Sequence, residues 1–188
     1  MNPSPQQAIA ATRAWVDEAV IGLNLCPFAK AVQVKNQVRY VVSETTDEET
    51  LLGQLRDEMS RLAATDPSEV DTTLIIHPWV LNDFIDFNDF LGLAEDALED
   101  LELEGVLQVA SFHPAYQFAG TAFDDISNYT NRSPYPTLHL LREDSVERAV
   151  AAFPDPDVIV ERNIETLDKL GVEGWTRLLG RKDNSRCH

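Results

Sequence analysis

The feature that most constrains the fold is an alternation along the chain between short apolar runs and longer amphipathic stretches. Thr72–Ile76 is an apolar run rich in β-branched residues, and Val38–Val42 and Val106–Phe112 are runs of similar length. Such runs are typical of β-strands, and a run without polar alternation indicates a strand that is covered on both faces. Because helical patterns separate the runs, we expect right-handed crossovers and a largely parallel sheet.

The helical stretches begin at recognisable capping signals. Ser4, Pro5 and Gln7 provide an N-cap, a proline in the first turn and a glutamine that closes a capping box, so the first helix begins there and ends before Pro27. The same kind of signal predicts further helices that begin at Thr46 (with Glu49), Asp83, Asp144 (with Glu147) and Asp155. The last of these helices is expected to end at Gly171.

A fourth strand, Thr137–Leu141, follows a long stretch, 113–136, that shows no periodicity. The predicted order is therefore α-β-α-β-α-β-β-α-α, which indicates a single α/β domain over residues 1–175 and a polar C-terminal tail over 176–188. We expect a mostly parallel central sheet of about four strands flanked by helices, with the fourth strand antiparallel at an edge or beside the third. This order matches that of thioredoxin-like folds, although no Cys-x-x-Cys motif is present.

The composition limits which binding partners and which cellular compartment we expect for the protein. The chain has 32 acidic and 15 basic residues and a formal net charge of −17. Such a surface repels nucleic acid and anionic membranes, and the bases are scattered, so neither is an expected partner. The first residues lack the basic start and apolar run of a secretory signal, and the two cysteines form no disulfide framework. We therefore predict a cytoplasmic protein.

Two predicted strands end in the same way, at His77-Pro78 and at His113-Pro114. If these strands are parallel neighbours, both imidazoles project at the carboxyl edge of the sheet, where open α/β sheets bind ligands. An antiparallel fourth strand would return the loop 113–136 to this edge. Each histidine could instead do no more than bond a loop carbonyl.

The loop 113–136 contains the side chains that we predict to bind a substrate. Arg132 is its only base, and a guanidinium can hold a carboxylate or a phosphate through two hydrogen bonds. Arg132 could equally pair with a nearby aspartate and fix the loop. The predicted substrate-binding residues are Arg132, Asn131, Gln117 and Tyr135.

Metal and thiol chemistry are alternatives. His77, His113 and His139 could hold a divalent metal such as zinc or iron, although none of the short ligand spacings is present. His139 lies between leucines in a strand, so it is either a site residue or a core histidine. Cys26 is either a small buried side chain or a catalytic thiol activated by a histidine. No glycine-rich phosphate motif is present, so no nucleotide cofactor is indicated.

The predicted helix Asp83–Glu104 is strongly acidic and contains no lysine or arginine. Carboxylates near its C-terminal end are disfavoured by the helix dipole. A solvated face would explain this composition. The alternative is a docking surface for a basic protein partner.

Three functional hypotheses follow, and the sequence does not decide whether the protein is an enzyme. The first is an enzyme that binds a small anionic molecule at the carboxyl edge of the sheet, with His113 as the acid/base; its reaction type is open. The second is a non-catalytic ligand-binding or adaptor module, which uses the loop 113–136 as its receptor and the acidic helix for docking. The third is a thiol enzyme centred on Cys26.

Several motifs together resemble one family. They are Gly22–Ala29, His113-Pro114, Gln117–Gly120 and Asn128–Pro136. Between residues 5 and 175, approximately, the chain resembles a bacterial family of single-domain proteins catalogued as domain of unknown function 1415. This family has no established reaction, so the resemblance implies no catalytic role. It implies only that the family's motif stretches include Cys26, His113, Gln117, Asn131 and Arg132.

Overall fold

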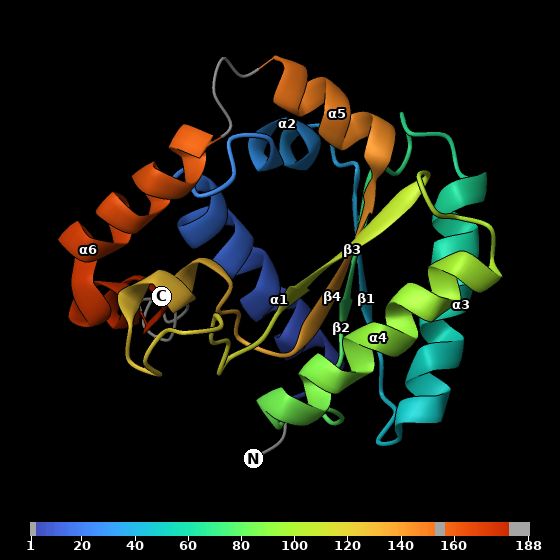
Figure 1. The fold of residues 1–188 in the computed structure, drawn as a ribbon, viewed down its shortest axis with the longest axis horizontal. Helices are drawn as coiled ribbons and strands as arrows, with labels where there is room; N and C mark the ends of the chain where they lie inside the picture. Colours follow the sequence, from blue (N-terminus) through green and yellow to red (C-terminus); the bar gives the residue numbers. More distant parts are fainter. Residues whose placement is uncertain (1–2, 153–156, 181–188) are drawn as a thin grey trace, which may run out of the picture.

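The computed structural model describes residues 3–152 and 157–180, which form a four-stranded sheet with helices on both sides (Figure 1). The strands are β1 (Val38–Val42), β2 (Thr72–Ile76), β3 (Leu107–Phe112) and β4 (Thr137–Arg142). Each strand agrees with a predicted one to within one residue at either end, because short apolar runs between turn signals favour strands.

The sheet is mixed, so the prediction of a mostly parallel sheet is wrong. The strand order is β1-β2-β4-β3. Among these strands only β1 and β2 pair in parallel, whereas β4 pairs antiparallel with both β2 and β3. β4 therefore lies beside the third strand, as predicted, but inside the sheet. The loop 113–136 contains no helix long enough for a parallel crossover, so the chain returns directly along β3.

The element order agrees with the prediction in part, because short helical segments were not foreseen. The described helices are α1 (Pro5–Trp15), the π-helix η1 (Val16–Ile21), α2 (Ala29–Val34), α3 (Glu48–Ala64), α4 (Phe84–Asp100), the 3-10 helix η2 (Ile126–Thr130), α5 (Glu143–Ala151) and α6 (Asp157–Gly180). η1 lies within the predicted first helix, which ends before Pro27, so only its π-helical form was not foreseen. The unforeseen segments are α2 and η2. They are too short for a 3.6-residue hydrophobic period to reveal.

The capping signals differ in how well they locate helix starts. The predicted capping box of α1 is confirmed, since Ser4 Oγ accepts from the amide of Gln7 and the Gln7 side chain accepts from the amide of Ser4. The prediction for α3 is wrong by one residue. Asp47 caps this helix in place of Thr46 and accepts from the amide of Thr50 at 2.8 Å. Aspartate is a better N-cap than threonine, which explains the choice.

The C-terminal helices depart further from the prediction. α5 begins at Glu143 with no side-chain cap, so the cap predicted at Asp144 is wrong. The start predicted at Asp155 lies outside the described residues. Gly171, at a φ of 64°, interrupts α6 as predicted, but helical structure continues to Gly180. Glycine suits this break because it adopts positive φ without steric cost.

The two faces of the sheet carry separate cores. α3 and α4 cover one face (Figure 1), where the largest buried side chains include Leu51, Phe87, Leu138 and Leu140. On the other face, α1, η1 and α6 enclose a second core that includes Trp15, Leu74, Leu167 and Trp175. Because side chains alternate along β4, His139 and Leu141 point to this second face.

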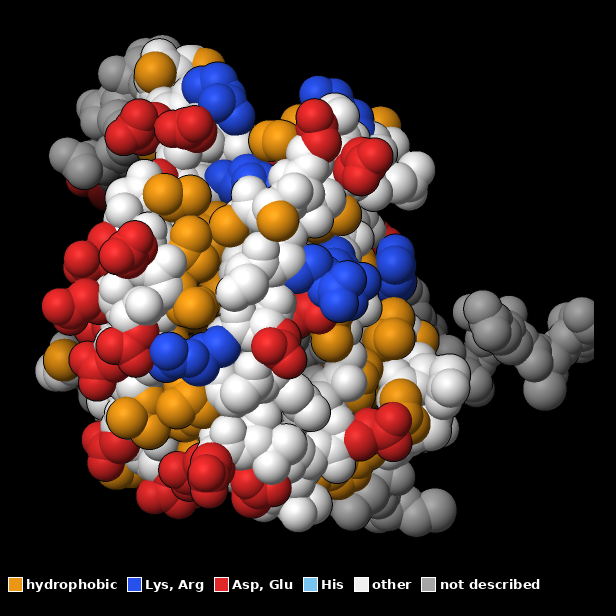
Figure 2. All heavy atoms as spheres, turned by 90° about the vertical axis from the view of Figure 1, so that its right-hand side faces the viewer, with side chains coloured by type: hydrophobic (Ala, Val, Ile, Leu, Met, Phe, Trp, Pro, Cys, Tyr) orange, Lys and Arg blue, Asp and Glu red, His pale blue; other side chains and the backbone are white. Residues whose placement is uncertain are grey.

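The surface carries the acidic excess of the composition. Acidic side chains gather along one side of the face shown in Figure 2. Among the described residues, one ion pair joins two helices, between Arg56 of α3 and Asp100 of α4 at 3.0 Å. Within residues 3–152 and 157–180, none of the helices combines the length and the apolar composition needed to cross a bilayer.

Candidate functional site

The loop 113–136 is held together by buried polar side chains. Asn128 is fully buried, and its Oδ1 accepts from the backbone N–H of Phe118 at 2.9 Å and from Thr121 Oγ1 at 2.8 Å. Its Nδ2 donates to the carbonyl of Ala122 at 2.8 Å. The polar density of this loop therefore serves the loop's own backbone.

Arg132 lies at the centre of the same loop. Its guanidinium carbon is 4.7 Å from the ring centroid of Phe123 and 4.3 Å from that of Tyr129. It donates to the carbonyl oxygens of Tyr116 and Phe123, and the residue is only 8% exposed. No carboxylate of the described residues forms an ion pair with it. Arg132 is thus enclosed by cation–π and carbonyl contacts.

His77 and His113 lie together on the α4 side of the sheet, and both rings pack against Phe87 at centroid distances of 5.7 and 5.1 Å. Nδ1 of His77 is 3.0 Å from a loop carbonyl, and Nε2 of His113 is 3.2 Å from the carbonyl of Leu81. Nδ1 of His113 accepts from the amide of Ala115 at 3.0 Å. Both nitrogens of His113 are therefore occupied by the backbone.

The other predicted binding residues also bond within the loop or to β3. Asn131 Nδ2 donates to the carbonyl of Ser111 at 3.1 Å, and Gln117 Nε2 donates to that of Thr121 at 2.6 Å. The carbonyl of Tyr135 accepts from a serine hydroxyl at 2.7 Å. Asn131, Gln117, Tyr135 and Arg132 therefore share one loop, but none of them lines either of the two cavities described below.

The larger of the two cavities lies on the opposite face of the sheet. This sheet-face cavity, as we call it, has a volume of about 870 Å³. Its walls come from α1, η1, the segment 26–35 and α5, and most of its lining is apolar. Pockets of roughly 300–1,000 Å³ with such a lining typically hold small molecules. Side chains from the sheet form its floor: Thr72, Leu74, Ala110, Phe112, His139 and Leu141.

His139 provides a polar group on the floor of the sheet-face cavity. Its Nε2 is 2.6 Å from Thr72 Oγ1, which is itself 2.6 Å from the carbonyl of Leu140. The hydroxyl donates to this carbonyl and accepts from Nε2–H, an assignment that follows from the hydrogen-bond network. Burial lowers the pKa of His139 to about 4, although part of the ring faces the cavity. The imidazole is therefore neutral at physiological pH.

Cys26 lies in the wall of the same cavity and carries a free, half-buried thiol. The structure thus brings Cys26 and His139 to one cavity and separates both from His77 and His113. The three histidines do not meet, because His139 faces the opposite side of the sheet from the other two. Across the described ranges, no group of three or more His, Cys, Asp or Glu side chains is arranged to hold a metal ion.

The π-helix η1 shapes the wall beside Cys26. The amides of Leu25 and Cys26 both donate to the carbonyl of Val20, at 2.9 and 3.3 Å. A Cβ atom on Gly22 would collide with the backbone oxygen of Glu18, so this wide turn requires glycine. π-helical turns occur often at functional sites.

Two cations stand at the rim of the sheet-face cavity. Lys35 and Arg148 are exposed, and neither pairs with a carboxylate of the described residues. The one acid in the lining, Asp71, accepts from Ser145 Oγ at 2.6 Å, and this hydroxyl accepts from Arg148 at 3.0 Å. Bases outnumber acids here in a chain of net charge −17. Neither cation could be singled out from the sequence, because each resembles an ordinary surface base and the two lie far apart in the chain.

We expect the buried histidines to titrate well below the usual imidazole pKa of 6.5. Burial lowers the pKa of His77 to about 4, as it does for His139, and burial also lowers that of His113. Between pH 4 and 6.5 the unfolded chain therefore binds more protons at these histidines than the folded chain does. Their contribution to the free energy of unfolding is present above pH 6.5 and is lost as the pH falls towards 4. NMR titration of the ring protons checks this, and midpoints near 6.5 for His77 and His139 would contradict the burial described here.

A family model described as "Protein of unknown function (DUF1415)" matches residues 7–177. The match includes both the loop around Arg132 and the segments that line the sheet-face cavity. No curated protein and no solved structure gives a significant match to the chain. No match to a solved structure therefore supports a thioredoxin-like fold, which was suggested by the order of helices and strands alone. Since the family model covers most of the sequence, this chain belongs to the DUF1415 family of proteins of unknown function.

Proposed function

We propose that this protein binds a small amphipathic anion, with its apolar body in the sheet-face cavity and its charged end at Lys35 and Arg148. The observation that carries the proposal is the cavity itself, a mostly apolar space of about 870 Å³ with two cations at its rim. A cavity of this size can bury most of a drug-sized molecule. Binding would move the apolar body out of water, at about 25 cal/mol per Å² of buried area.

The positions of the charges favour an anion over a neutral ligand. A carboxylate that enters an apolar space without a partner is strongly disfavoured, so the charged end of a ligand belongs where it keeps both water and a counter-ion. Lys35 and Arg148 are exposed at the rim and satisfy both conditions. The proposal retains the anionic ligand expected from the sequence but moves it from the carboxyl edge of the sheet to the face of the sheet.

The surroundings of the candidate catalytic groups favour binding over turnover. His139, with a pKa of about 4, is a weak base at neutral pH and is poorly suited to activating the thiol of Cys26. His113 donates to one backbone group and accepts from another, which leaves no nitrogen for a substrate. The non-catalytic alternative for this chain is therefore the better supported one.

We expect the protein to bind decanoate about fivefold more tightly than decanol, because only the carboxylate can pair with the rim cations. An exposed ion pair contributes about 0.2–1 kcal/mol, so two such pairs account for a preference of this size. In the double variant Lys35→Gln/Arg148→Gln the preference should disappear, while decanol binding stays unchanged. Isothermal titration calorimetry of both ligands at low ionic strength measures this.

The matched control removes two cations of the same kinds elsewhere. Lys30→Gln/Arg162→Gln changes the net charge equally, and both residues are exposed and lie outside the cavity. The control should keep the preference for decanoate. Equal loss of preference in both double variants would show that overall charge, and not the rim, attracts the anion.

A further inference from the structure

β3 forms the edge of the sheet opposite β1, and this edge is a candidate binding surface separate from the sheet-face cavity. β3 pairs with β4 on one side, and no described strand pairs with its other side. Proteins usually protect such an edge with lysine, proline or an inward charge. The sequence of β3, LQVASF, contains none of these.

The backbone of β3 leaves hydrogen-bonding groups available at this edge. In an antiparallel pair, successive residues turn their N–H and C=O groups alternately towards and away from the partner strand. The amide of Leu107 donates to the carbonyl of Leu103, and the carbonyl of Ser111 accepts from Asn131, so both residues turn away from β4. Val109 lies between them and shares their orientation. Its N–H and C=O therefore face outward.

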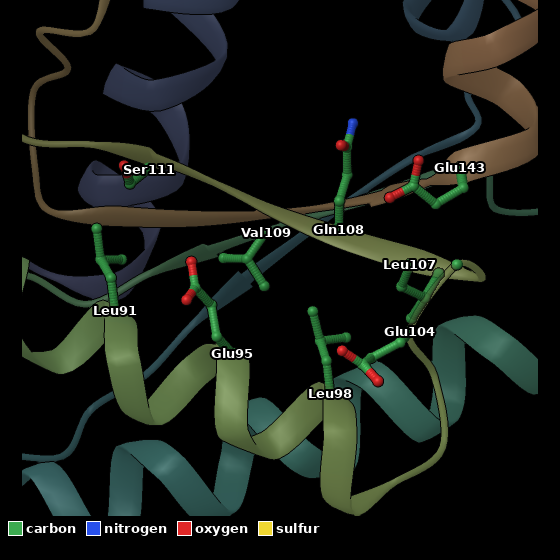
Figure 3. Close-up of a pocket in the computed structure, with 10 residues that line it drawn as sticks. Leu91, Glu95, Leu98, Glu104, Leu107, Gln108, Val109, Ser111 and Glu143 are labelled. Atoms are coloured by element: carbon green, nitrogen blue, oxygen red, sulfur yellow. The ribbon is translucent and has the colours of Figure 1, made fainter.

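A groove runs between this edge and α4. This edge groove, as we call it, has a volume of about 470 Å³. In Figure 3, Leu91, Glu95 and Leu98 point from α4 towards β3, while Gln108 points away from α4. Gln108 is shared with the sheet-face cavity, but the two hollows lie on opposite faces of the sheet. The groove thus offers apolar side chains beside an open strand edge.

The charges of the edge groove are all negative. Glu95, Glu104 and Glu143 line it, and the lining contains no base. No lysine or arginine of the described residues pairs with any of the three. An occupant with positive charges would therefore meet uncompensated carboxylates along the groove.

We propose that the edge groove binds an extended basic segment of a partner protein, which adds a strand to β3. Backbone hydrogen bonds to Val109 would provide affinity, and alternate lysine or arginine side chains would reach the three glutamates. A second copy of this chain fits poorly, because edge-to-edge pairing would bring together two acidic grooves on molecules of net charge −17. The acidic helix would then form part of a binding surface for a basic partner.

The test uses an acetylated, amidated peptide of alternating lysine and valine, labelled for fluorescence anisotropy. Val109→Pro should weaken its binding at least tenfold, because proline removes the outward N–H, and an edge strand tolerates proline at such a position. Val109→Ala keeps the N–H and should bind within about twofold of the wild type. Hydrogen exchange at the amide of Val109 should slow when the peptide is bound.

A second set of variants keeps the proposal testable if Val109→Pro does not fold. Glu95→Gln/Glu104→Gln/Glu143→Gln should weaken binding about tenfold, the sum of three exposed ion pairs. Glu69→Gln/Asp86→Asn/Asp89→Asn removes the same charge from exposed positions outside the groove and should change binding less than twofold, roughly.

Three outcomes would overturn the proposal. The first is no binding of the peptide at millimolar concentration. The second is equal weakening by the groove variant and its control, which would make the attraction a property of overall charge. The third is a dimer in sedimentation that Val109→Pro dissociates, which would make a second copy the occupant of the edge.

Discussion

Replacement of Arg132 with alanine is expected to lower the free energy of unfolding by about 3 kcal/mol. The guanidinium lies between the rings of Phe123 and Tyr129 and donates to two loop carbonyls while nearly buried. Each cation–π contact contributes about 0.5–2 kcal/mol, and carbonyls left without a donor cost a further 1–3 kcal/mol, roughly. Urea denaturation measures the change.

Arg13 provides the matched control for this experiment. Its guanidinium also stacks on an aromatic ring, that of Tyr40 at 4.1 Å, but the residue is exposed. Arg13→Ala should therefore cost less than about 1 kcal/mol. If Arg132→Ala costs no more than Arg13→Ala, the loop does not depend on Arg132, and the anion-binding role predicted from the sequence would regain support.

The strands could be predicted from the sequence, but their order in the sheet could not. All four strands were located because apolar runs between turn signals depend only on local sequence. The central place of β4 depends on tertiary pairing. A signal was present: Leu138 and Leu140 face one core while His139 and Leu141 face the other side, whereas β3 carries the polar Gln108 and Ser111. Polar residues in β3 are typical of an edge strand.

The candidate site was predicted only in part. The loop around Arg132 was correctly identified as densely polar, but polar residues that bind a ligand and polar residues that satisfy a loop backbone have the same composition. Asn128 shows the second case most clearly, since its side chain bonds only to the loop. The sheet-face cavity left no local signal, because Ala110 and Phe112 read as ordinary core residues. Whether space remains between such residues is set by how α2 and α5 lie over the sheet.

Filling the sheet-face cavity should have the largest effect on ligand binding. Ala110 lies on the floor in β3, and its small side chain leaves space above the sheet. A tryptophan there would occupy the volume that the apolar body of a ligand needs. Excluding three or four methylene groups costs about 3 kcal/mol at about 0.8 kcal/mol for each, so Ala110→Trp should weaken decanoate binding about a hundredfold.

The fold should tolerate this substitution, because the new side chain enters an existing cavity and displaces no packed neighbour. Ala64→Trp is the control, since Ala64 is exposed at the end of α3 and lies outside the cavity. Both variants should unfold within about 1 kcal/mol of the wild type. A large loss of stability in Ala110→Trp alone would show that the space above β3 is smaller than described.

Calorimetric titration of decanoate into the wild type, Ala110→Trp and Ala64→Trp tests whether the sheet-face cavity holds the anion. Decanoate should bind the wild type and Ala64→Trp with equal affinity, and should bind Ala110→Trp about a hundredfold more weakly. Equal affinity in all three proteins would contradict this expectation, because the anion would then bind somewhere other than the sheet-face cavity.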